Sequence, residues 1–186
     1  MSLNLLQSLQ TNTGYAALKK IDPNTQQTTD DGTIEDKLNQ AVIPGVLIVL
    51  YKYTRTDAGA QRVITESLSN EWLQSMLGED TGDAVNKVAE YSGVTTIRAK
   101  ERMEMIARQA VGLIRESNPA SANDVKNILS GERNNILKYL PPTLHMGELL
   151  NDNTLDDNVT KMEGPVSGLM NAIGNIFSGS EKTDKN

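Results

Sequence analysis

The chain carries its most regular set of potential metal ligands near the C-terminus. The stretch "DNTLDDNVTKME" puts Asp152, Thr154 and Asp156 at positions one, three and five of a calcium loop, and Glu163 at position twelve. Side-chain oxygens at this spacing are ligands that Ca²⁺ takes. Position six, where the loop needs glycine, holds Asp157, and a Gly-Pro pair interrupts the helix that should follow. An acidic linker or helix start explains the stretch better, and we expect no bound metal.

His145 is the only histidine, in "PPTLHMGELL". A histidine acts as a general base when a second group orients it and a nucleophile lies within reach. The sequence locates neither group, and one histidine cannot build a histidine-rich metal site. A "GxxxxGK" phosphate loop and a serine nucleophile elbow are also absent from the sequence. We interpret His145 as a packing or surface residue, and expect a protein without catalytic residues or cofactors.

A third group is basic and follows a possible helix-turn-helix. In "VAEYSGVTT" (residues 88–96), Ala89 stands four residues before Gly93, and an apolar residue comes next. This is the spacing of the turn in repressor-type DNA-binding motifs. The helix after the turn carries Arg98, Lys100 and Arg102, which would be the residues that contact phosphates.

Two features of that second helix favour a structural corner over a DNA reader. The motif buries two positions behind the turn, here Ala99 and Arg102, and an arginine is not easily buried without a partner. The apolar stripe also continues to Ile114, whereas a recognition helix has a short inward face. Glu101 and Glu104 interrupt the basic face. DNA association through the corner at residues 85–103 is therefore the alternative function.

Composition restricts the function further. The 186 residues carry a net charge of -6, which repels phosphates and anionic lipids unless one face is locally basic. The absence of cysteine excludes disulfides, thiol catalysis and thiolate metal sites. The N-terminal residues lack the basic and apolar regions of a secretory signal, so we expect a cytoplasmic protein. The longest apolar run, residues 41–51, is too short to cross a membrane and predicts a buried core helix.

Apolar residues recur at three- and four-residue intervals along most of the chain, and no segment alternates as a strand does. We therefore predict an all-α fold with one multi-helix domain over residues 1–150. One or two short helices are expected up to Ile21, followed by a mobile loop over residues 22–32. Thr33 should cap a helix that Pro44 kinks or restarts.

Later helices are expected from the same periodicity. One runs through Val63 to Leu77, because "TRTDAGAQ" (residues 54–61) breaks the pattern before it. "EDTGD" (residues 79–83) reads as a turn. A short helix then ends at Gly93, a long one covers residues 95–117, and helical turns continue to the proline pair at 141–142.

The two halves of the chain are weakly alike. "VLIVLYKYTRTDAGA" (residues 46–60) and "AVGLIRESNPASAND" (residues 110–124) align at an offset of 64 residues. Each is an apolar helix end, a polar turn of small residues and the start of another helix. The match favours a pseudo-duplicated helical array, and a chance likeness between two amphipathic helices is the competing explanation.

Three pieces of the chain carry a family resemblance. They are "IPGVLIVLYKYTRTDAGA" (43–60), "MLGEDTGDAVNKVAEYSGV" (76–94) and "LSGERNNILKYLP" (129–141). Their pattern of small residues and leucines, each followed by an apolar helix, resembles the YidB-like family of small bacterial proteins of unknown function. The resemblance implies an all-helical bacterial protein, with no catalytic residues to carry over.

The C-terminal region predicts a separate contact element. After an acidic linker at 151–163, "GPVSGLMNAIGNIF" (164–177) forms an amphipathic helix with proline at its first position. Its apolar stripe contains the candidate partner-binding residues Val166, Leu169, Met170, Ile173 and Phe177. Three docking sites for the stripe are consistent with the sequence: its own domain, a protein partner and a second copy. A membrane is the least favoured site, because the polar face of the helix is nearly uncharged. Residues 178–186 are expected to be a disordered tail.

The favoured function from sequence is therefore non-enzymatic. We expect a protein-protein interaction or scaffold module that associates with itself or a protein partner through apolar helix faces.

Overall fold

The computed structural model describes residues 4–21, 32–68 and 71–152. Within these ranges every regular element is a helix, so the predicted all-α class is confirmed. The predictions for residues 22–31 and for residues after 152 lie outside the described residues. They concern the loop, most of the linker, the C-terminal amphipathic helix and the tail.

The described elements follow one another as helices and two short 3₁₀ turns. In chain order they are α1 (Leu5–Thr13), α2 (Ile34–Thr54), α3 (Asp57–Thr65), α4 (Trp72–Leu77), η1 (Gly78–Asp80), α5 (Thr81–Ser92), α6 (Thr96–Glu116), α7 (Ala122–Leu137), η2 (Pro142–Leu144) and α8 (Met146–Leu149).

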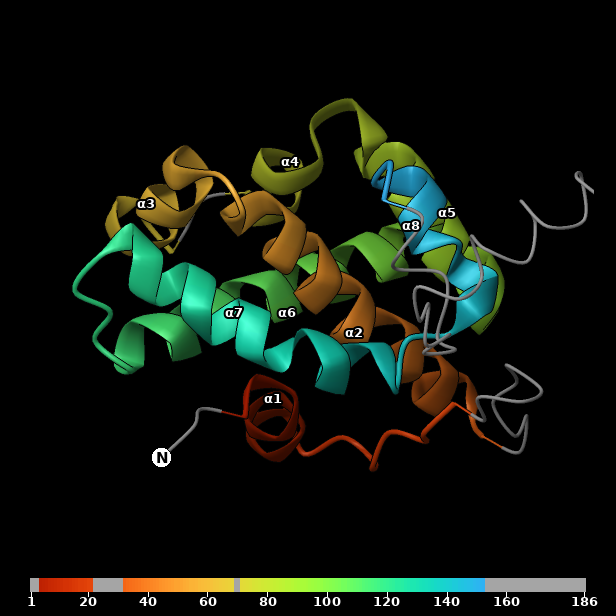
Figure 1. The fold of residues 1–186 in the computed structure, drawn as a ribbon. Coiled ribbons are helices and arrows are strands. Elements are labelled where there is room, and N and C mark those ends of the chain that lie inside the picture. The colour runs from red at the N-terminus through yellow and green to blue at the C-terminus, as the bar shows by residue number, and fades with distance from the viewer. Residues whose placement is uncertain (1–3, 22–31, 69–70, 153–186) are drawn as a thin grey trace, which may run out of the picture.

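Helix α2 forms the centre of the fold. It runs through the middle of the molecule between α6 and α7, with α3 near its C-terminal end and α5 near the other end (Figure 1). Every residue from Leu38 to Leu50 is buried. The apolar run predicted to be a core helix therefore is one, surrounded on all sides by other helices.

Of the two predicted effects of Pro44, a kink or a restart of the helix, the restart is wrong. α2 continues without a break from Ile34 to Thr54, with Pro44 buried inside it. Proline removes one backbone N–H and crowds the preceding turn, which usually bends an exposed helix. Here the helices packed around α2 hold the chain in helical form through Pro44, because tertiary packing supplies most of a helix's stability.

Of the one or two short helices expected up to Ile21, the structure has one, and the segment after α1 is not helical. Gly14 adopts the left-handed conformation (φ 68°) and ends α1. The buried side chain of Gln40 then binds the extended segment: its Oε1 accepts from the Lys19 N–H at 2.8 Å, and its Nε2 donates to the Lys19 carbonyl at 3.0 Å. The same Nε2 donates to the Tyr139 carbonyl at 2.7 Å. Gln40 thus joins the segment to the end of α7.

The single helix expected through residues 63–77 is two helices. α3 begins at Asp57, where Thr56 caps it by accepting from the Gly59 N–H, so the predicted break at residues 54–61 is short. α4 begins only at Trp72. The apolar spacing continues across the gap, but the helix ends are held by side chains of α6 that no local pattern reveals.

The corner between α5 and α6 forms where the sequence predicts it. Gly93 ends α5 in the left-handed conformation (φ 70°), and the Thr95 hydroxyl caps α6 by accepting from the Arg98 N–H. The turn predicted over residues 79–83 is shorter than expected, because Thr81 already begins α5. The helical turns predicted after residue 121 form one continuous helix, α7.

The two halves share a plan that fits the internal match. α2 and α6 each have 21 residues and a threonine N-cap. Each is followed by a second helix with a hydroxyl N-cap, Thr56 for α3 and Ser121 for α7. Duplication of the sequence stays a prediction.

No helix within the described ranges is both long enough and apolar enough to span a membrane.

Candidate functional site

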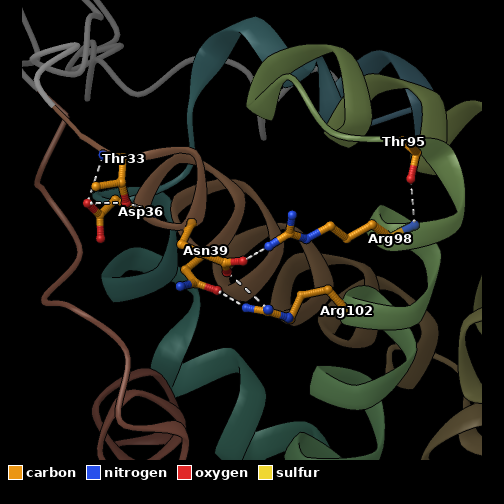
Figure 2. A network of polar contacts seen from close by, with 7 residues as sticks. Thr33, Asp36, Asn39, Thr95, Arg98 and Arg102 are labelled. Atoms are coloured by element: carbon orange, nitrogen blue, oxygen red, sulfur yellow. Dashed lines mark hydrogen bonds and ion pairs between the residues drawn. The ribbon is translucent and has the colours of Figure 1, made fainter.

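Two of the three basic residues after the corner bind a carboxylate of another helix. Arg98 and Arg102 reach from α6 toward the first turns of α2 (Figure 2). The Arg98 guanidinium donates to one carboxylate oxygen of Glu35, and Arg102 donates to the other at 3.0 Å. One carboxylate therefore binds both of the arginines among the three basic residues that the DNA alternative requires.

Arg102 is the more enclosed of the two arginines. Its side chain is 17% exposed and also donates to the Asn39 amide oxygen at 2.6 Å. On its other side the guanidinium lies 4.7 Å from the centre of the Tyr15 ring, within range of a cation–π interaction. The sequence correctly places Arg102 at an inward position. Asn39 and Glu35 supply the partners that a buried arginine needs.

Lys100 lies on another face of the same helix. It makes no ion pair with any described residue. Lys100 and Ile97 line a groove of about 490 Å³ that is bounded by α4, η1, α5 and the first turn of α6. The three residues of the DNA alternative are thus divided between a partly exposed cluster at Glu35, which holds Arg98 and Arg102, and the groove, which Lys100 lines.

The groove combines an apolar projection with an open wall. Ile97 is 71% exposed, the largest exposure among the large apolar side chains of the described residues. Val85 and Gly82 of α5 line the same groove. A Cβ atom added at Gly82 would have no heavy atom within 4 Å, so this wall has room for a side chain.

The groove also carries two opposite charges. Glu79 of η1 and Lys100 of α6 both line it, and both are exposed. Neither makes an ion pair with the other or with another described residue. The groove therefore brings one exposed isoleucine together with small residues and two opposite charges that have no ion-pair partner among the described residues.

Two further charges of α6 hold the ends of other helices. The Glu104 carboxylate accepts from the N–H groups of Trp72 at 2.7 Å and Leu73 at 2.9 Å, which begin α4. These are donors that a helix cannot satisfy by itself. Arg115 donates to the carbonyls of Val63 and Glu66 at the end of α3. Glu104, predicted only to interrupt the basic face, therefore caps another helix, and Arg115 binds the end of a third.

A smaller polar cleft lies between α2 and α7. It has a volume of about 200 Å³ and is lined in part by Arg55 and Lys126. Lys126 donates to Asp57 at 2.6 Å, and this hydrogen bond lowers the pKa of the Asp57 carboxyl. Arg55 lies 3.2 Å from Asp152. Both cations already have carboxylate partners within the chain.

The candidate calcium ligands are only partly described. Asp152 lies 3.5 Å from Lys52 as well as 3.2 Å from Arg55, so its carboxylate faces two cations. Thr154, Asp156 and Glu163 lie outside the described residues. Within the described part of the chain, no three side chains of His, Cys, Asp or Glu gather in a way that could hold a metal ion.

His145 is exposed at the start of α8, in the left-handed conformation (φ 45°). The predicted partner-binding residues of the C-terminal stripe (Val166, Leu169, Met170, Ile173 and Phe177) lie outside the described residues.

Sequence reasoning missed the residues that give the site its form. Neither Glu35 nor Asn39 is among the predicted site residues. The inward position of Arg102 signals that a partner must exist, but not that the partner lies 63 residues earlier in the chain. The groove carries no local signal, because η1, α5 and α6 form it together.

Comparisons of the chain with protein-family models, with curated proteins and with solved structures give no match. The resemblance to the YidB-like family therefore stays a prediction from the quoted motifs.

Proposed function

We propose that this chain is a non-enzymatic protein-interaction module, and that its contact surface is the groove at the start of α6. The observation that carries the proposal is Ile97, which is 71% exposed at the rim of a groove with an open wall at Gly82. Protein interfaces bury apolar side chains of this kind at their centres and surround them with polar groups. Glu79 and Lys100 supply such groups.

DNA association remains the alternative, carried by the corner between α5 and α6. Arg98 and Arg102 both bind Glu35, and a guanidinium bound to a carboxylate attracts a phosphate weakly. These contacts therefore count against DNA binding. Lys100 alone stays available, on a chain of net charge -6. Salt-dependent DNA binding that is lost in Lys100→Glu would favour this alternative over ours. We expect no shift of duplex DNA at low salt.

The predicted stripe at 164–177 is a second, separate contact in this proposal. Removing residues 164–186 tests it: an unchanged melting temperature with loss of association supports a partner contact, whereas a lower melting temperature supports docking on its own domain.

The proposal is tested by cross-linking from the groove. A photoreactive amino acid replaces Ile97 in the full chain, and a matched protein carries it at Ile34, which is 55% exposed but does not line the groove. In the native cells we expect a discrete protein adduct from position 97 and none from position 34. Gly82→Leu, which fills the groove, should suppress the adduct. Equal labelling from both positions, or no adduct from position 97, contradicts the proposal.

A further inference from the structure

The groove has the features of a surface that pairs with itself. Ile97 is largely exposed at this groove, and Gly82, which also lines it, has room for a further side chain. In a twofold dimer the same patch meets itself, so each copy must offer both a projection and a place to receive it. This groove offers both within one surface.

The charges of the groove have the same property. Glu79 and Lys100 line it together but form no ion pair within the chain. Because the same surface carries one charge of each sign, a twofold axis through the groove can pair Glu79 of each copy with Lys100 of the other. Opposite charges then meet twice at the rim, where such pairs contribute to orientation and specificity. A surface with one sign of charge would instead repel its own copy.

We infer that this chain forms a twofold dimer in which Ile97 of each copy inserts into the groove of the other, between α5 and η1. The inference rests on the proposed function and names the partner of that surface as a second copy. A stable interface buries roughly 800 Å² on each partner, so the exposed first turns of α5 and α6 belong to the contact together with η1.

The test is the mass of the full chain in solution by light scattering over a concentration series. Wild type should approach twice the mass of one chain. Ile97→Glu should weaken association by at least roughly 30-fold, the effect of removing a central contact residue. Ile34→Glu, which changes an exposed isoleucine outside the groove, should leave association unchanged.

Two further variants separate docking from a folding defect. Gly82→Leu adds a side chain where the single chain has open space, so the fold should persist while the dimer dissociates. Glu79→Lys and Lys100→Glu should each weaken the dimer several-fold, and the double variant should restore it, because the two charges exchange places.

Several outcomes overturn the inference. Wild type could stay monomeric at every concentration, or the dimer could persist in both Ile97→Glu and Gly82→Leu. Loss of the dimer only on removal of residues 164–186 would assign it to the C-terminal stripe. A monomer whose position 97 cross-links to a different protein overturns the dimer and leaves the proposed function standing. A monomer without any adduct overturns both.

Discussion

The polar side chains of α6 fall into two regions that differ in what they bind. Toward the molecule, Arg102, Glu104 and Arg115 each bind another element, and each is at least partly buried. Around the first turn, Lys100 and Ile97 extend from the same helix without a partner among the described residues. The charged side chains that face the other helices therefore stabilise the fold, whereas Lys100 at the groove is available to contact another molecule.

This difference bears on the resemblance of α6 to a DNA-recognition helix. Arg98 and Arg102 of α6 have the spacing of phosphate contacts, but in the structure they bind a carboxylate of the same chain. Glu35 binds Arg98 and Arg102, so Lys100 is the one of the three basic residues that lines the groove, together with Ile97, Glu79 and several polar or small residues. For this reason we propose a protein partner for the groove and keep DNA as the alternative.

The largest effect on stability is expected from Glu104→Ala. The substitution removes the carboxylate that accepts from the Trp72 and Leu73 N–H groups. We expect the free energy of unfolding in urea to fall by about 2 kcal/mol, as for hydrogen bonds to charged groups. Glu101→Ala is the matched control, because Glu101 is exposed on the same helix. A similar loss in both variants would show that the capping contact contributes nothing.

A smaller effect is expected from Arg102→Met, which keeps the length of the side chain. The buried Asn39 amide oxygen loses its donor at 2.6 Å, and the free energy of unfolding should fall by about 1–2 kcal/mol. Lys100→Met should leave that free energy within about 0.5 kcal/mol of wild type but weaken the dimer. If Lys100→Met destabilises the fold as much as Arg102→Met, the division of α6 into two regions is wrong.

The smallest effect concerns a buried carboxyl on α7. Glu132 is 7% exposed, and burial raises its pKa above the ordinary value of 4.5. A raised pKa means that the contribution of this group to stability is complete below the unfolded-state pKa and is lost as the pH rises through the folded-state pKa. Glu132→Gln stays neutral at all pH values and avoids that loss.

Urea unfolding at two pH values measures this effect. We expect Glu132→Gln to be slightly more stable than wild type at pH 7, and the difference to shrink as the pH falls toward 4. A difference that grows on acidification would contradict the assigned role of burial.

Local rules predicted much of the fold. The all-α class, the core helix at residues 41–50, the Thr33 cap, the Gly93 turn and the long stripe of α6 follow from periodicity and capping alone. The errors occur where distant residues decide. Pro44 stays helical because other helices surround it. The segment after Gly14 is extended because Gln40 binds its backbone.

The candidate site was predicted less completely for the same reason. Spacing located Arg102 at an inward position, since its place in the helix is a local property. Arg102 binds partners on α2, and Ile97 lines a groove that several helices form together. Both features depend on how distant helices pack, so no single stretch of the sequence predicts them.

The central claim is that the groove at the start of α6 is covered by a second copy. Amide hydrogen exchange at low and high protein concentration tests it most directly, because amides in the first turns of helices open readily and exchange more slowly when a second copy covers them. We predict that exchange in residues 78–86 and 96–100 slows as the concentration rises, while exchange on the exposed face of α7 does not change. Equal exchange in these segments at both concentrations, in a sample whose mass doubles, would contradict the claim.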